Sequence, residues 1–124
     1  MIVDNTEVLI EIGQQQFHCA MDVTMHYIGG KWKTVVLWYL RNDKKRFSEL
    51  KTHMPQITEK MLSIQLKQLE QDGLINRIVH TSKPPLKVEY SLTDFGKSLI
   101  PLLNEIASWG RKTGKEKGKM VKAR

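Results

Sequence analysis

The sequence has little of what several large classes of protein require. It contains one cysteine, Cys19, which excludes an internal disulfide, and no apolar run approaches the roughly 18 residues of a membrane-spanning helix. Residues 1–12 lack the basic segment of a secretory signal peptide. A length of 124 residues suits one domain. We therefore expect a single-domain cytoplasmic protein with no membrane partner.

Side chains that would carry out catalysis or bind a metal are also sparse. The four histidines are scattered, and no His-x-x-x-His or Cys-x-x-Cys spacing occurs, so the sequence predicts no zinc site. Gly29 and Gly30 are too few to form a phosphate-binding loop. The sequence accordingly predicts no metal, no cofactor and no enzymatic activity.

Basic residues outnumber acidic ones, 20 to 13, and they are unevenly distributed. Residues 1–28 hold four acidic and no basic side chains, whereas residues 110–124 hold seven basic side chains against Glu116. The net charge of +7 favours anionic partners such as nucleic acid. The excess in the middle of the chain is smaller, so a basic surface there depends on where the side chains lie.

Hydrophobic spacing, capping residues and prolines predict a mostly α-helical domain with one small β-hairpin. The proline-rich segment 81–86 cannot pair as a strand and is predicted to be the projecting tip of that hairpin. The predicted elements are a helix over Val23–Ile28 with Asp22 as N-cap, a helix over Lys31–Leu40, a helix over Phe47–Met54 ended by Pro55, a helix from N-cap Thr58 to Asp72 followed by Gly73, strands over Ile75–His80 and Val88–Leu92, and a last helix capped by Thr93.

The two ends of the chain are less well determined. Val8, Ile10 and Ile12 alternate as in a strand, although residues 7–17 suit a helix equally well. The segment after Trp109 is too rich in lysine and glycine to fold by itself. The predicted divisions are an N-terminal arm over 1–18, a domain over 19–109 and a basic tail over 110–124.

The last helix carries an apolar seam with heptad spacing. A seam of about two heptads is marginal alone, so it should pack against this domain or a second copy. Pro101 lies inside this helix and predicts a kink near residues 97–101. Trp32 is also on an apolar stripe and is expected in the core. The seam residues are Phe95, Leu99, Leu102, Ile106 and Trp109.

The helix from Thr58 to Asp72 has two different faces. Leu62, Leu66 and Leu69 share one side of the helical wheel and are predicted to be buried. The opposite side carries lysines, amides and a serine without an acidic residue at its centre, while Glu59 and Glu70 fall near the core edge. This side could meet DNA, or it could be an ordinary solvated helix face. The exposed residues are Lys60, Met61, Ser63, Ile64, Lys67, Gln68 and Gln71.

Helix, helix, helix, hairpin, helix is the order of a winged helix-turn-helix. An ordered set of fragments extends over about Cys19 to Trp109: Cys19, Ile28-Gly29-Gly30-Lys31-Trp32, Lys45-Arg46-Phe47-x-Glu49-Leu50, Lys60-x-Leu62-Ser63-x-x-Leu66-x-x-Leu69-Glu70-x-Asp72-Gly73-Leu74 and Pro84-Pro85-x-x-Val88-Glu89-Tyr90-Ser91-Leu92-Thr93-x-x-Gly96. This set resembles the HxlR family of bacterial transcriptional regulators. Two positions depart from the family pattern: Ile64 stands where glutamine is common, and Ala20 follows Cys19 where proline is common.

The resemblance implies a homodimer that binds double-stranded operator DNA with inverted-repeat symmetry, as a repressor rather than an activator. The helix from Thr58 would enter the major groove, the hairpin would be the wing, and the seam would form the dimer. We expect phosphate contacts from Lys83 and Lys87 of the wing and from Lys44, Lys45 and Arg46 before the helix over Phe47–Met54.

Some members of the resembled family sense oxidants or electrophiles through a cysteine at the position of Cys19. The competing interpretation is a buried, inert thiol, and the sequence names no effector. A winged helix that binds protein instead of DNA is the main alternative function, because the fold does not dictate a ligand. A thiol-dependent redox enzyme is a more distant one.

Overall fold

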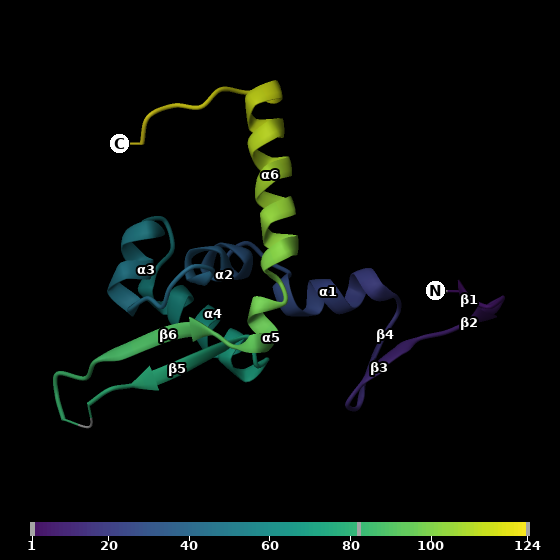
Figure 1. Cartoon of the computed structure of the whole chain (residues 1–124), viewed down its shortest axis with the longest axis horizontal. Helices are drawn as coiled ribbons and strands as arrows, with labels where there is room; N and C mark the ends of the chain where they lie inside the picture. The colour runs from purple at the N-terminus through teal and green to yellow at the C-terminus, as the bar shows by residue number, and fades with distance from the viewer. Residues whose placement is uncertain (1, 82, 124) are drawn as a thin grey trace.

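Helices and hairpins follow one another in the predicted order in the computed structural model, which describes residues 2–81 and 83–123 (Figure 1). Strands β5 and β6 form the predicted hairpin, and two smaller hairpins precede the first helix. The elements are β1 (Ile2–Val3), β2 (Thr6–Glu7), β3 (Ile10–Ile12), β4 (Gln15–Phe17), α1 (Ala20–Ile28), α2 (Lys33–Leu40), α3 (Phe47–His53), α4 (Glu59–Gln71), β5 (Ile75–Val79), β6 (Val88–Leu92), α5 (Asp94–Lys97) and α6 (Ile100–Lys117).

The hydrophobic core lies where α2, α3 and α4 meet the base of the β5–β6 hairpin. The three leucines predicted to be buried on α4 are all inaccessible to solvent, as is Leu50 of α3. Leu37 of α2 is also fully buried. The core residues are Ile28, Val36, Leu37, Leu40, Leu50, Met54, Ile57, Leu62, Leu66, Leu69, Leu74, Ile75, Leu92 and Leu103.

The ends of α4 follow the predicted local chemistry. The Thr58 hydroxyl accepts a hydrogen bond from the backbone N–H of Met61 at 3.0 Å, which satisfies a donor that has no partner within the helix. Gly73 has φ +78°, the left-handed conformation that ends many helices. These two residues confirm the predicted bounds of α4.

The first two helices begin at different residues from those predicted. Helix α1 starts at Ala20 with Cys19 as N-cap, so Asp22 lies inside its first turn. The Asp22 carboxylate accepts from the backbone N–H of His18 at 3.1 Å, which is a capping role played from within the helix. Helix α2 starts at Lys33 rather than Lys31, because the chain still bends after Gly30.

The predicted terminal helix is two helices. Instead of kinking at Pro101, the chain leaves α5 after Lys97 and begins α6 at Ile100. Proline occupies the first turn of α6, where its missing N–H has no partner to lose. Helix α6 also continues to Lys117, past the predicted end at Trp109, because extending an established helix costs little compared with nucleating one.

The N-terminal arm forms strands, which resolves the two alternatives left by its sequence. Strands β1 and β2 pair, as do β3 and β4, all antiparallel. Phe17 is buried and its ring lies 5.2 Å from the ring of His26, edge to face. The arm and the β5–β6 hairpin extend from opposite sides of the body, and α6 rises between them (Figure 1).

The structure contains a backbone contact that the sequence did not predict: a third segment pairs with the β5–β6 hairpin. The backbone N–H of Lys45 donates to the carbonyl of Tyr90 at 2.9 Å, and Tyr90 returns a bond of 2.8 Å. This bridge ties the turn before α3 to β6. The position of the hairpin is therefore fixed by backbone hydrogen bonds as well as by packing.

Candidate nucleic-acid interface

One long face of α4 is open to solvent while the opposite face is closed by the core. Leu62, Leu66 and Leu69 are 0%, 2% and 0% exposed. Lys60, Lys67 and the other residues predicted for the outer face are all exposed. The structure thus brings the predicted α4 residues together on one surface. Thr58 stands at its beginning, and its members are Lys60, Met61, Ser63, Ile64, Lys67, Gln68 and Gln71.

The two acidic residues of α4, Glu59 and Glu70, are exposed. Their exposure is compatible with the predicted position near the core edge. Glu59 occupies the first turn, where a negative charge complements the positive end of the helix dipole. Glu70 instead faces the hairpin across a cleft.

That cleft separates α4 from the β5–β6 hairpin and has a volume of about 290 Å³. Arg77 of β5 and Tyr90 of β6 form its other wall, and they are directly opposite each other in the strand register. The sequence reasoning missed Arg77, although its basic side chain within the predicted wing was a usable signal. The α4 residues that line the cleft are Ser63, Leu66, Lys67 and Glu70.

The tip of the hairpin presents the two predicted lysines. Lys83 and Lys87 are exposed, and the hydroxyl of Thr81 organises the chain around them. That hydroxyl donates toward the carbonyls of Lys83 and Pro85 and accepts from the N–H of Lys87, each at 3.3 Å. The predicted tip also includes Ser82, which lies outside the described residues.

The three basic residues before α3 have different environments. Arg46 is exposed at the N-cap of α3, where its backbone N–H donates to the Glu49 carboxylate at 2.9 Å. Lys45 is half-buried by the bridge to Tyr90. Lys44 is exposed, but its ammonium lies 3.9 Å from the carboxylate of Glu89. Of the three, Arg46 has its charge most available to a phosphate.

Glu89 is a buried carboxylate that the alternating pattern of β6 places on the outside. It is 8% exposed, and its Oε1 lies 2.6 Å from Nε2 of His80 as well as near Lys44. The carboxylate therefore connects the hairpin to the turn before α3, because burying a charge is tolerated only when partners surround it. No feature of the sequence distinguishes this glutamate from an exposed one.

Cys19 is half-exposed at the start of α1. The thiol is therefore more accessible than the buried, inert cysteine that was the competing prediction. Among the residues that the structure describes, no cluster of histidine, cysteine or acidic side chains could hold a metal ion. Within the same residues, no helix is both long and apolar enough to cross a membrane.

The predicted seam is largely uncovered, but the break after α5 divides it. Phe95 of α5 is 48% exposed and its ring contacts that of Tyr27 of α1, 5.2 Å away. Leu99 is half-buried at the start of α6. The remaining seam residues lie on α6 and are exposed: Leu102 by 38%, Ile106 by 43% and Trp109 by 71%.

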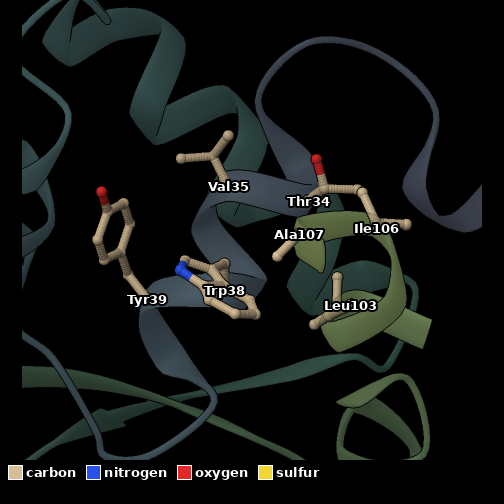
Figure 2. A pocket seen from close by; sticks show the side chains of 7 residues that line it. All are labelled: Thr34, Val35, Trp38, Tyr39, Leu103, Ile106 and Ala107. Atoms are coloured by element: carbon tan, nitrogen blue, oxygen red, sulfur yellow. The ribbon is translucent and has the colours of Figure 1, made fainter. Parts of the chain in front are cut away.

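An apolar groove runs beside the seam, between α2 and α6. Its volume is about 280 Å³, and side chains from both helices point into it (Figure 2). Ile106 belongs to the groove and to the seam, so the two form one continuous apolar surface. The lining residues are Thr34, Val35, Trp38, Tyr39, Leu103, Ile106 and Ala107.

Comparison with known proteins places this architecture in a family of regulators. A family model described as HxlR-like helix-turn-helix matches residues 27–118. The uncharacterized HTH-type transcriptional regulator YtcD of Bacillus subtilis (strain 168) is 50% identical over 97 residues, which are 78% of this chain and 76% of that protein.

Solved structures agree in fold. The redox regulator HypR in its reduced form is 41% identical, with a TM-score of 0.73 over 77% of this chain and 93% of that chain. The reduced form of the transcriptional regulator YodB from B. subtilis is 32% identical, with a TM-score of 0.66 over 82% of this chain and 98% of that chain.

Proposed function

The chain belongs to the HxlR-like helix-turn-helix family, and on that premise we propose that it is a homodimeric repressor that binds inverted-repeat operator DNA through α4 and the β5–β6 hairpin. It is a DNA-binding transcriptional regulator with a winged helix-turn-helix fold, and not an enzyme. The proposal also places it in the cytoplasm, with the chromosome.

The observation that carries the proposal is the division of α4 into a closed and an open face. Because the leucines fill the core, the open face has no cover from the body of this chain. In the proposed complex Lys60 and Lys67 contact phosphates or guanine edges. Met61 and Ile64 supply apolar surface for a thymine methyl.

The remaining contacts of α4 are polar. Ser63 and Gln68 donate or accept hydrogen bonds at base edges or backbone. Thr58 starts the helix, so the N–H groups of the first turn face the duplex with it. In the proposed complex α4 therefore makes contacts to the DNA backbone, which do not depend on sequence, and contacts to base edges, which do.

The flanking basic residues position the complex without reading sequence. Lys83 and Lys87 reach the backbone from the wing, and Arg46 does so from the start of α3. Lys44 and Lys45 contribute less to the salt dependence, because Glu89 partly neutralises the first and the second is half-buried.

The dimer follows from the apolar surface on α5 and α6. Phe95, Leu102, Ile106 and Trp109 would be covered by the same residues of a second copy, as a two-fold interface requires. The half-buried Leu99 would pack beneath these four side chains. Two recognition helices would then enter successive major grooves about 34–36 Å apart, which predicts one helical turn between half-site centres.

A selection experiment tests the proposal. The full-length protein is used to select duplexes from a random library, and fluorescence anisotropy compares the selected duplex with random DNA at several salt concentrations. We expect a preference of at least about 1,000-fold and an inverted repeat. Lys67→Ala should weaken binding to the selected duplex and flatten its salt dependence, whereas Lys112→Ala on α6 should change neither. A protein-binding module would show no such preference.

A thiol response through Cys19 is a second proposal, and the half-exposed thiol supports it together with the likeness to HypR, which is named a redox regulator. A two-electron oxidant such as diamide would join the Cys19 thiols of two protomers in a disulfide and change DNA affinity. Cys19→Ser should keep the affinity of the reduced protein and lose the response. An equal response in both proteins, or no response in either, contradicts the proposal.

A further inference from the structure

We propose that the cleft between α4 and the β5–β6 hairpin seats a single phosphate of the DNA backbone, held by Lys67 and Arg77, and that Glu70 in the same cleft limits the strength of this contact. The inference rests on the proposed function and deepens it. It adds Arg77, which the wing residues predicted from the sequence do not include, and it gives an acidic residue of α4 a role in binding.

The geometry brings the two cations to one place from different elements. Ser63, Lys67 and Glu70 are separated by four and three residues, so they lie along one side of α4. Arg77 faces Tyr90 across the strand register, and residues directly opposite in an antiparallel pair project from the same side of the sheet. Both sets line the same cleft.

The cleft contains groups that can bind a phosphate. Besides the buried Leu66 and the carboxylate of Glu70, its lining has one lysine, one arginine and the hydroxyl-bearing residues Ser63 and Tyr90. Arginine binds phosphate oxygens in a bidentate manner and lysine adds a compact charge. Arg77 forms no ion pair with any residue in the described part of the chain, so its guanidinium is available.

Glu70 opposes this contact. Its carboxylate shares the cleft with Lys67 and Arg77, so it attracts both cations when DNA is absent and repels a phosphate when DNA arrives. A contact to the backbone is the same for every sequence. The effect of Glu70 should therefore be equal on operator and on random DNA.

Single-phosphate substitution tests the site. Duplexes selected by the wild-type protein are synthesised with one neutral methylphosphonate at each position in turn, and affinities are measured for wild type, Lys67→Gln, Arg77→Gln and the control Lys112→Gln. The control removes the same charge from α6, which points away from the hairpin (Figure 1). Thermal unfolding confirms that each variant is folded.

We expect Arg77→Gln to weaken binding about tenfold. It should reduce the slope of log K against log salt by about 0.9, the value for one phosphate contact. One methylphosphonate position should weaken the wild type most, and the same position should weaken Lys67→Gln and Arg77→Gln less, because each variant has lost one of the two cations that hold that phosphate. If Arg77→Gln keeps the wild-type salt slope, or if the two variants lose sensitivity at different phosphates, the proposed seat is wrong.

Glu70→Gln should change DNA affinity in the opposite direction. It should strengthen binding to operator and random DNA by the same factor, about twofold to fivefold. Unchanged affinity, or a gain limited to the operator, contradicts the role given to Glu70. A wild-type protein with no preference for selected over random DNA would instead overturn the proposed function, so the two failures are distinct.

Discussion

The winged-helix body and the two ends of the chain use similar apolar residues but cover them differently. In the body, Leu62, Leu66 and Leu69 are almost completely buried. At the ends, Leu9 is 54% and Trp109 is 71% exposed. Most of the buried hydrophobic side chains thus lie where α2, α3, α4 and the hairpin meet, and few lie at the ends. At the ends the same kind of side chain is left for another surface to cover.

The difference separates what holds the fold from what connects it to partners. Substitutions at buried positions of the body should change the free energy of unfolding, whereas substitutions at exposed positions of the arm or of the outer half of α6 should leave it nearly unchanged. Four predictions test this contrast, from the largest expected effect to the smallest.

Gly96→Ala should have the largest effect. A Cβ at this position would lie 2.1 Å from the carbonyl oxygen of Leu74, and a backbone atom cannot move aside as a flexible side chain can. We expect a loss of about 4 kcal/mol or more, in the range reserved for severe core defects. Urea denaturation of the variant measures this loss. A loss below about 1 kcal/mol would show that α5 can shift away from the hairpin.

Leu66→Ala should remove about 2–5 kcal/mol, because it deletes buried methyl groups and leaves a cavity in the core. The matched change Leu9→Ala removes the same atoms from an exposed position and should cost less than about 0.5 kcal/mol. Both are measured by the midpoint of urea unfolding. Equal losses would mean that the arm is as much a part of the core as α4.

Thr93→Val should cost about 1–2 kcal/mol. The valine keeps the shape of the side chain but removes the hydroxyl that accepts from the N–H of Gly96 at 2.9 Å and donates to the carbonyl of Gly73 at 2.6 Å. Thermal unfolding monitored by circular dichroism measures the change. Thr93→Ser, which keeps both bonds, is the control and should recover most of the stability.

Gly110→Ala should have the smallest effect and the opposite sign. The position is helical, and a Cβ there would meet nothing within 4 Å. Alanine is favoured over glycine in a helix by about 1 kcal/mol. Because this part of α6 lies beyond the core, the gain should appear as added helical circular dichroism rather than as a higher midpoint. A raised midpoint would indicate that the outer half of α6 unfolds together with the body.

Local chemistry explains which parts of the fold could be predicted. The bounds of α4 follow from Thr58 and Gly73, whose roles depend only on neighbouring backbone. The predicted start of α1 was wrong because an aspartate can cap a helix either as the N-cap residue or from within the first turn. Asp22 does so from within the first turn. Pro101 is likewise compatible with a kink inside one helix or with the first turn of a new helix, and it lies in the first turn of α6.

The candidate interface divides in the same way. The exposed side of α4 was predicted because periodicity determines one face once the leucines determine the other. Arg77 and Glu89 were missed because their importance comes from what lies across from them: α4 for the first, and His80 and Lys44 for the second. The sequence shows that Arg77 is a basic residue of the predicted wing, but which residues lie across from Arg77 and Glu89 depends on the tertiary structure.

The hydrogen bonds of Thr93 have a consequence for the spacing of the DNA half-sites that the proposed dimer would bind. Its backbone N–H donates to the carbonyl of Leu74 at 3.1 Å, next to the end of α4, and its hydroxyl begins α5. These bonds tie the start of α5 to the end of α4, so they help to fix the angle between α4 and the terminal helices. In the proposed two-fold dimer built on α6, that angle would determine the distance between the two copies of α4 and with it the spacing of the operator half-sites.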